Sequence, residues 1–208
     1  MSTKSARFSA AGACAAVLGL ACLPKPATAA DSALRIYWSD QRGYLRDKLV
    51  SRGYDTMARE VSAILLDAGV EVEWTPLIAE PSDGVVVVLT PADGSKWGLQ
   101  SSTLGAVMGR GGPVTCVYVF FPAVARLLGV RRTRSARDFH ELGKAIGRVA
   151  AHEIVHAFTP EFPHTPEGLM MAHLTRGDLR GNDLRLSASA AAAFHGALKL
   201  RDHANTKP

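Results

Sequence analysis

The spacing of hydrophobic and polar residues predicts strands that alternate with helices. Residues 33–38 are typical of a strand, and residues 44–68 carry apolar side chains at helical spacing up to Gly69, a residue type that commonly ends helices. Residues 70–77 alternate apolar and polar side chains, which indicates a strand with one buried face. Residues 85–89 form an unbroken run of Val and Leu, which favours a strand buried on both faces. The first half of the chain therefore predicts three strands and one long helix.

The second half predicts two more strands and three more helices. These elements are a weak edge strand at residues 99–108, a strong strand at residues 114–121, a short helix at residues 122–128, a long helix at residues 135–158 capped by Ser135 or Asp138, and a closing helix at residues 187–200. Pro160, Pro163 and Pro166 break the chain between the last two helices into an irregular loop. In the first long helix, Gly53 either divides the helix or marks its true start.

Residues 1–30 have the pattern of a secretory signal. Two basic residues come first, residues 10–23 are apolar, and small residues offer a cleavage site near residue 29 or 30. We therefore expect a secreted or periplasmic protein whose mature chain, residues 31–208, forms a single domain. No later segment is long and apolar enough to predict a membrane span.

Composition and charge give no reason to expect a nucleic-acid partner. The 208 residues are 47% hydrophobic and 21% charged, which is ordinary for a globular protein, and the formal net charge is +5. The predicted signal, residues 1–30 (the leader), holds three of the 24 basic residues and none of the 19 acidic ones. The mature chain therefore carries a formal net charge of only +2. We interpret the arginines within residues 131–137 as a solvated loop. Cys116 is the only cysteine outside the leader, which excludes an internal disulfide and predicts a buried, unreactive thiol.

The long helix contains the pattern that carries chemistry. His152, Glu153 and His156 form an H-E-x-x-H motif, which places both imidazoles one turn apart on the same helix face. Two such imidazoles can hold one Zn²⁺, and the adjacent carboxylate can take the proton of a water that the metal activates. The apolar face of the helix continues directly onto these histidines, and buried imidazoles need partners because unpaired polar groups are costly to bury. The motif therefore favours a zinc site with Glu153 as general base.

A catalytic zinc site uses three protein ligands and keeps one position open. Pro160 ends the helix, so the chain can turn back toward the metal, and His164 is our choice for the third ligand. Four other side chains compete for this role: Glu161, Glu167, His173 and Asp178.

The motif and its surroundings resemble the zincin metallopeptidases, and within them the metzincin branch, which has the pattern H-E-x-x-H-x-x-G-x-x-H. Here Thr159 stands at the Gly position and Phe162 at the third His position, so that His164 makes an H-E-x-x-H-x7-H variant. Residues 168–170 (Gly-Leu-Met) resemble the Met-containing turn below the metal, with Met170 as its methionine. The resemblance implies that His152, His156 and His164 ligate zinc.

The same resemblance implies an α+β fold, with a mixed sheet and its backing helix followed by the active-site helix. Residues 31–158 would form this part, and residues 159–208 a small irregular subdomain with a final helix. The edge strand at 99–108 would bind an extended peptide or protein substrate. The sequence does not identify the oxyanion stabiliser, for which His173 and Arg176 are the two candidates. The implied activity is that of a zinc metalloendopeptidase in which Glu153 is base and acid. No long propeptide is evident between the signal and the first strand, so we expect such an enzyme either to be made in active form or to be held in check by a protein inhibitor.

Two other classes of protein remain open. The first is an exported zincin-fold protein that binds zinc but does not cleave peptides, and the presence of Glu153 argues against it because zinc binding alone does not need this carboxylate. The second is an exported α/β binding module in which the motif is accidental, and it predicts no stoichiometric metal.

Overall fold

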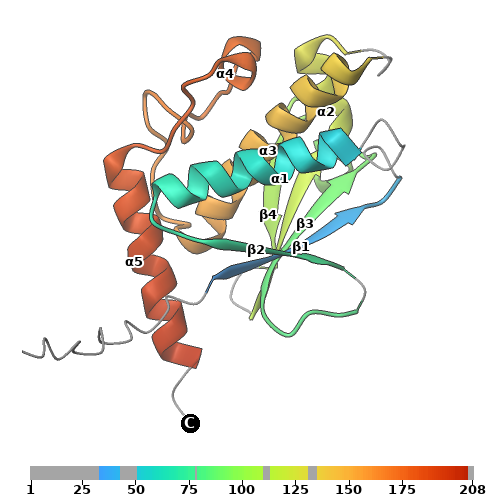
Figure 1. Ribbon diagram of the computed structural model, residues 1–208. Coiled ribbons are helices and arrows are strands. Elements are labelled where there is room, and N and C mark those ends of the chain that lie inside the picture. Colours follow the sequence, from blue (N-terminus) through green and yellow to red (C-terminus); the bar gives the residue numbers. More distant parts are fainter. Residues whose placement is uncertain (1–32, 43–50, 78, 110–112, 131–134, 206–208) are drawn as a thin grey trace, which may run out of the picture. The chain divides into compact units, whose positions relative to one another are not determined.

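Five strands form one mixed sheet in the order β2-β1-β3-β5-β4 (Figure 1). The computed structural model describes residues 33–42, 51–77, 79–109, 113–130 and 135–205. The strands are β1 (Leu34–Asp40), β2 (Val72–Pro76), β3 (Gly84–Thr90), β4 (Gly105–Met108) and β5 (Val114–Phe120). Neighbouring strands are parallel except for β4, which pairs antiparallel with β5 at one edge. This mixed sheet confirms the predicted α+β class.

Five α-helices and one 3₁₀ helix accompany the sheet within the described residues. They are α1 (Ser51–Asp67), the 3₁₀ helix η1 (Gly94–Trp97), α2 (Phe121–Leu128), α3 (Ala136–Phe158), α4 (Arg176–Arg180) and α5 (Ala188–Asn205). Helices α1 and α3 pack against each other on one face of the sheet, with α1 as the predicted backing helix (Figure 1). On the opposite face, Trp97 of η1 packs against the rings of Tyr118 and Phe120.

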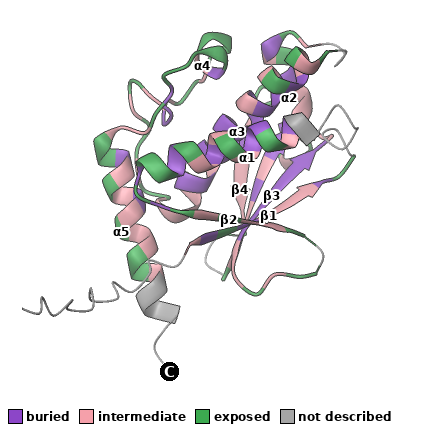
Figure 2. Ribbon diagram, viewed as in Figure 1, coloured by how far each residue is buried: buried purple, intermediate pink, exposed green. Residues whose placement is uncertain are grey.

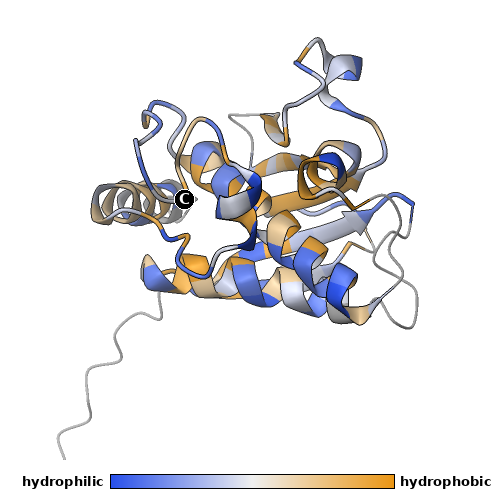
Figure 3. Cartoon of the chain, turned by 90° about the horizontal axis from the view of Figure 1, so that it is seen from above, coloured by the Kyte–Doolittle hydropathy of each residue, from blue (hydrophilic) through white to orange (hydrophobic). Residues whose placement is uncertain are grey.

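The core lies between the sheet and the two long helices. The central strand β3 is buried from Val85 to Thr90, as its unbroken apolar run predicts, and α3 is buried over most of its length (Figure 2). Hydrophobic residues gather on the strands and on the helix faces turned toward them, whereas the outer helix faces are hydrophilic (Figure 3). The burial of apolar surface therefore fixes which face of α3 points inward.

Two glycines allow α1 and α3 to approach closely. A Cβ atom added to Gly143 would lie 2.3 Å from the carbonyl oxygen of Gly53, and one added to Gly147 would lie 2.9 Å from the carbonyl oxygen of Met57. Both contacts involve backbone atoms, which cannot rotate away. The small residues of α3 thus set its distance from the backing helix, and with it the position of the histidines further along α3.

A buried arginine joins α3 to two other parts of the chain. The Arg148 side chain is 1% exposed, and its Nε donates a hydrogen bond to Glu60 of α1 at 2.6 Å. Its Nη1 donates to the backbone carbonyl of Asp178, at the start of α4, at 2.5 Å. Because one guanidinium bonds to both, α3 is held to the backing helix and to the C-terminal segment at the same place.

Within the described residues the element boundaries agree with the predictions, except that α5 extends to Asn205, that part of one predicted strand is a turn, and that two short helices are additional. Helix α1 begins at Ser51, and residues 43–50 of the predicted helix lie outside the described residues, as does the predicted leader. The predicted strand at 99–108 is wrong in its first half, because the turn after η1 occupies residues 99–104 and β4 begins only at Gly105. The short elements η1 and α4 were not predicted, and both depend on side-chain caps, from Asp93 and Thr175.

Two smaller expectations concern Cys116 and membrane insertion. Cys116 is half-buried rather than buried, and desolvation raises the pKa of its thiol, which keeps it in the unreactive protonated form at neutral pH. Among the described residues, none of the helices has the length and apolar character needed to cross a membrane.

Candidate metal centre

Helix α3 places the H-E-x-x-H residues at its C-terminal end. A capping box starts the helix: the Ser135 side chain accepts a hydrogen bond from the backbone N–H of Asp138, and the Asp138 carboxylate accepts one from the backbone N–H of Ser135. From there the helix runs without interruption, so His152 and His156 lie one turn apart with ring centroids separated by 4.7 Å. The regular helix alone therefore fixes how these two imidazoles are spaced.

The structure brings His164 to the same place. One ring nitrogen from each of His152, His156 and His164 lies within 4.8 Å of the others, and the Nε2 atoms of His156 and His164 are 3.2 Å apart. His152 is buried, His156 half-buried and His164 exposed. In the described part of the chain, this is the one group of three or more His, Cys, Asp or Glu side chains with such close spacing.

A backbone carbonyl orients the innermost histidine. The Nδ1 atom of His152 lies 2.7 Å from the carbonyl oxygen of Leu169, and because a carbonyl can only accept, Nδ1 carries the proton and Nε2 keeps its lone pair. Burial lowers the pKa of His152, an effect partly opposed by the hydrogen bond to Leu169 and reinforced by nearby His164. His152 is therefore held neutral, which is the form that binds a metal.

The end of α3 shows why the chain can turn back toward the helix. Thr159 is the C-cap residue, with φ −126°, and its Oγ1 donates to the carbonyl of Val155 at 2.7 Å. This φ is negative, so the position does not require glycine and Thr can replace the Gly of the metzincin pattern. Phe162 then donates its backbone N–H to the Thr159 carbonyl, and its side chain packs against the core and also lines the pocket of the histidines.

The segment after His164 forms a second turn, which lies against His152. The backbone N–H of Thr165 donates to the carbonyl of Met170, and Leu169 donates to the carbonyl of Arg185. Gly168 has φ +78°, a conformation that L-residues rarely adopt. Met170 is 1% exposed and belongs to the hydrophobic core. The predicted Met turn thus anchors His152 through the Leu169 carbonyl, with the Met170 side chain packed in the core.

Glu153 lies beside the histidines, against the edge strand. A Cβ atom added to Gly105 of β4 would lie 2.7 Å from Cγ of Glu153 and 2.9 Å from Cγ1 of Val149. Gly105 therefore leaves the space in which the Glu153 side chain sits. Sequence reasoning missed Gly105, although a glycine inside a predicted strand is itself a signal of close approach.

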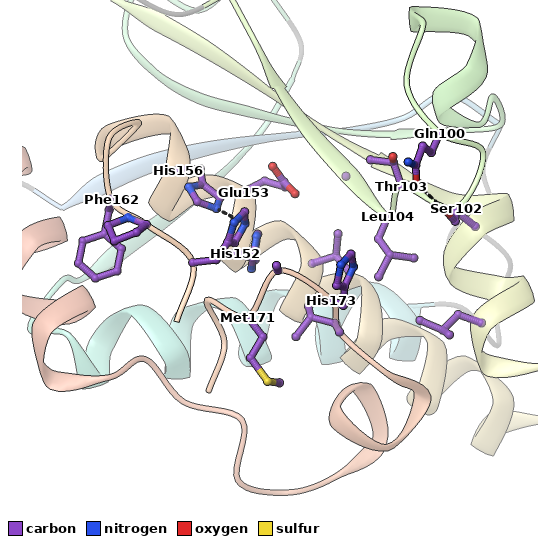
Figure 4. Close-up of a pocket in the computed structure, with 18 of the residues that line it drawn as sticks. Gln100, Ser102, Thr103, Leu104, His152, Glu153, His156, Phe162, Met171 and His173 are labelled. Carbon is purple, nitrogen blue, oxygen red and sulfur yellow. Dashed lines mark hydrogen bonds between the residues drawn. The ribbon is translucent and has the colours of Figure 1, made fainter. Parts of the chain in front are cut away.

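The three histidines and Glu153 line one cleft of about 880 Å³ (Figure 4). One wall comes from the turn before β4, where Gln100, Ser102 and Thr103 are polar, and the opposite wall comes from the segment that includes Met171 and His173. Helix α2 closes one end. The cleft is thus built from elements far apart in sequence.

None of the four alternative third ligands belongs to the close group of His152, His156 and His164. Glu161 and His173 line the cleft but are not part of the close histidine group. The Asp178 carboxylate accepts hydrogen bonds from the backbone N–H and Oγ1 of Thr175, which assigns it to the cap of α4. Glu167 is exposed and outside the group. Of the two predicted oxyanion stabilisers, His173 is in the cleft lining, whereas Arg176 lies next to Gly129 at the end of α2.

The donor set fits a zinc-sized ion. Ligands at about 2.0–2.1 Å from a tetrahedral metal are separated by about 3.3 Å, and the Nε2 atoms of His156 and His164 are 3.2 Å apart. His152 contributes an imidazole whose proton is already placed on the far nitrogen by Leu169. Three imidazoles leave one tetrahedral position open toward the cleft.

Comparison with known proteins supports the fold. The structure is similar to that of archaemetzincin from Methanopyrus kandleri, with a TM-score of 0.50, 16% sequence identity, and coverage of 81% of this chain and 97% of that one. A zinc-dependent peptidase from Methanocorpusculum labreanum has a TM-score of 0.49 and 13% identity, with coverage of 78% and 100%. No protein-family model matches the chain, and no curated protein matches its sequence. The metzincin-like fold predicted from the H-E-x-x-H region is therefore confirmed.

Proposed function

We propose that this protein hydrolyses peptide bonds as a zinc-dependent metalloendopeptidase. The observation that carries this proposal is the meeting of His152, His156 and His164 in a cleft that also holds Glu153. His152 and His156 lie one turn apart on α3, and His164 lies on the loop that follows. The three imidazoles therefore meet only when this loop folds back against the helix. The likeness in fold to archaemetzincin supports the same reading.

The proposed chemistry divides between the metal and the protein. Zinc held by three imidazoles supplies a Lewis acid that polarises a carbonyl group and acidifies water. Glu153 follows His152 directly and faces the cleft, so its carboxylate is placed to take the proton of the attacking water and to return it to the leaving amine. The Leu169 carbonyl keeps His152 in one tautomer throughout. His173 in the opposite wall is the side chain best placed to stabilise developing negative charge.

We propose that the substrate binds as an extended peptide along β4. Strand β4 is an edge strand, paired with β5 in the described part of the sheet, and Gly105 and Leu104 line the cleft beside it. An extended peptide can add to such an edge through backbone hydrogen bonds. Because residues 1–32 lie outside the described part of the chain, export through the leader stays a proposal that rests on the sequence pattern alone.

The first experiment measures metal content and cleavage together. Protein purified without chelator should contain about one zinc per chain, Glu167→Ala should keep it, and His164→Ala should lose it or bind it more weakly. Glu153→Gln should keep the zinc but lose cleavage of an unbiased peptide library by about 100-fold or more. Absence of zinc from every form, even after zinc is added back to folded protein, would leave the binding-module alternative as the better account.

A further inference from the structure

One end of the cleft differs in charge from the metal centre. The acids that line the cleft are Glu153 and Glu161, and both belong to the segment that carries the histidines. At the other end, three residues of α2 line the cleft: Ala123, Arg126 and Leu127. Their spacing places all three on one helix face. The lining residues that α2 contributes therefore include a basic residue and no acidic one.

The lining at this end mixes the polar residues Gln100, Ser102 and Thr103 with apolar ones. Leu104 comes from the β4 side, Leu127 from α2 and Val149 from α3, one turn before His152 and hence about 5 Å from it along the helix axis. Figure 4 shows His173 and Leu104 on the opposite side of His152 from Phe162. A substrate residue in this end could place its methylene groups against these apolar side chains and its terminal group toward Arg126.

The Arg126 charge is not neutralised by an ion pair with any described residue. Asp93 feels the charge of Arg126, but the Asp93 carboxylate accepts hydrogen bonds from the Oγ and backbone N–H of Ser95. These hydrogen bonds lower the pKa of Asp93, and the charge of Arg126 adds only a smaller effect. Asp93 is also outside the cleft lining. A bound carboxylate would therefore meet an arginine without a competing direct partner.

The surroundings add positive charge at the same end. The Arg176 guanidinium lies next to Gly129, which follows α2, and the Nη2 of Arg180 donates to the carbonyl of Leu128 at 3.3 Å. Arg180 is itself paired with Glu141, whereas Arg176 forms no ion pair within the described residues. These contacts also hold the segment after His173 against α2, so that the two walls of this end are built together.

We propose that Arg126 selects substrates that carry a carboxylate on a residue next to the scissile bond. This inference rests on the proposed peptidase function and names its substrate class. The carboxylate has two sources, a glutamate side chain within a longer peptide or the free carboxyl group at a peptide's C-terminus. Arg126 is a specificity-determining residue in either case, since it contacts the substrate but takes no part in bond cleavage.

The test uses peptides that differ only at the residues beside one cleavable bond. Alanine-rich octapeptides, blocked at both ends, carry Glu, Gln or Lys at each flanking position, and a second set has a free C-terminal carboxyl group. For the zinc-loaded protein we expect kcat/KM to be about tenfold higher for a Glu peptide than for its Gln counterpart, as for other charge-assisted hydrogen bonds. A higher kcat/KM for the free-carboxyl set than for the blocked set, with no preference for Glu over Gln, would assign the carboxylate to the C-terminus.

Variants assign the preference to Arg126. Arg126→Gln should abolish it, and Arg126→Glu should invert it in favour of Lys peptides. Arg59→Gln, on the exposed surface of α1, should leave it unchanged. Equal rates for Glu and Gln peptides together with equal rates for the blocked and free-carboxyl sets, or a preference that survives in Arg126→Gln, would overturn the proposal.

A binding measurement separates this proposal from the proposed function. The zinc-loaded Glu153→Gln protein should bind the Glu peptide about tenfold more tightly than the Gln peptide, measured by fluorescence anisotropy, and the Glu153→Gln/Arg126→Gln double variant should not discriminate. Selective binding without cleavage of any peptide by the unmodified protein would support the role of Arg126 and contradict the peptidase function. Cleavage without discrimination would do the reverse.

Discussion

The metal centre joins two regions that hold their histidines in different ways. Helix α3 carries His152 and His156 on a continuous, largely buried helix packed against α1 and the sheet. The loop from Thr159 to Thr175 carries His164, which is exposed, and a few backbone hydrogen bonds and one glycine with positive φ define its course. The helix therefore presents a rigid half-site, whereas the loop half depends on contacts that a metal would complete.

Removal of the metal is expected to have the largest effect, and to act on the two regions unequally. If zinc is present at about 1,000 times its dissociation constant, chelation lowers the free energy of unfolding by about 4 kcal/mol. Amide hydrogen exchange should speed up in residues 162–174 and change little in the buried part of α3. An equal change in both regions would show that the loop is as rigid as the helix without metal.

Arg148 joins α3 to α1 and to Asp178, just after the loop, so its loss is expected to weaken the attachment of both regions. Arg148→Met leaves Glu60 without its partner and the Asp178 carbonyl without its donor, which should cost about 3 kcal/mol of unfolding free energy. Arg137→Met is the matched control, because its pair with Glu141 is exposed and should contribute less than about 0.5 kcal/mol. Urea denaturation of both variants compares them. Similar losses would mean that Arg148 contributes no more than a surface arginine.

Gly105 tests whether the sheet holds Glu153 as firmly as the helix holds the histidines. Gly105→Ala places a Cβ atom against Glu153 and Val149. Because we propose Glu153 as general base, we expect peptide hydrolysis to fall about 100-fold, as for a reacting group displaced by about 1 Å. Zinc content should stay near one per chain, because the nearest neighbours of the added Cβ atom belong to Glu153, Tyr118 and Val149 and not to a histidine. Loss of zinc together with activity would instead indicate that β4 supports the whole centre.

The part of the metal centre on α3 could mostly be predicted from the sequence, because it depends on residues that are close together in the chain. Helical spacing aligns His152 with His156, and Ser135 is one of the two caps expected from residue type. The position of Glu153 follows from the same helix. The buried strand at Val85–Leu89 could also be predicted, because its unbroken apolar residues alone indicate burial on both faces.

The part of the metal centre on the loop could be predicted only in part, because its course depends on contacts between residues far apart in the chain. His164 was the preferred third ligand, but neither its distance to His156 nor the contact between His152 and Leu169 follows from spacing. These contacts depend on Thr159 and on bonds to residues as distant as Arg185. The prediction of a strand over the first half of 99–108 is wrong for a similar reason. The Asp93 side chain caps η1, and the chain that follows this helix forms a turn.

Gly168 is the backbone position at which the loop half should be most sensitive. Gly168→Ala strains a residue with φ +78° and brings a Cβ atom to 2.7 Å from the Arg185 carbonyl oxygen, which should cost about 2 kcal/mol. Zinc affinity should fall about tenfold, because the adjacent Leu169 carbonyl orients His152. Gly177→Ala, in α4, has room for the methyl group and should not reduce either quantity. Competition with a chromogenic zinc chelator measures the affinities.

The cap of α4 should give the smallest effect, and one that depends on pH. Hydrogen bonds from the side chain and backbone of Thr175 lower the pKa of Asp178. A carboxylate whose pKa is lower in the folded state stabilises the protein at pH values above its unfolded pKa of about 3.9, and this stabilisation disappears as the pH falls through the folded pKa. Asp178→Asn should therefore cost about 0.5 kcal/mol at pH 7, since solvent screens the group.

Comparing Asp178→Asn with the unmodified protein at pH 7 and at pH 3 sharpens the contrast between the regions. The difference in unfolding free energy should shrink at pH 3, because the unmodified carboxyl is then becoming protonated and loses its advantage as a cap. Asp183→Asn controls for the change in net charge, since Asp183 is exposed and outside the capping box. A difference that grows toward acid pH would contradict the cap. It would mean that α4, and the cleft wall that precedes it, is held by Arg148 rather than by its own helix start.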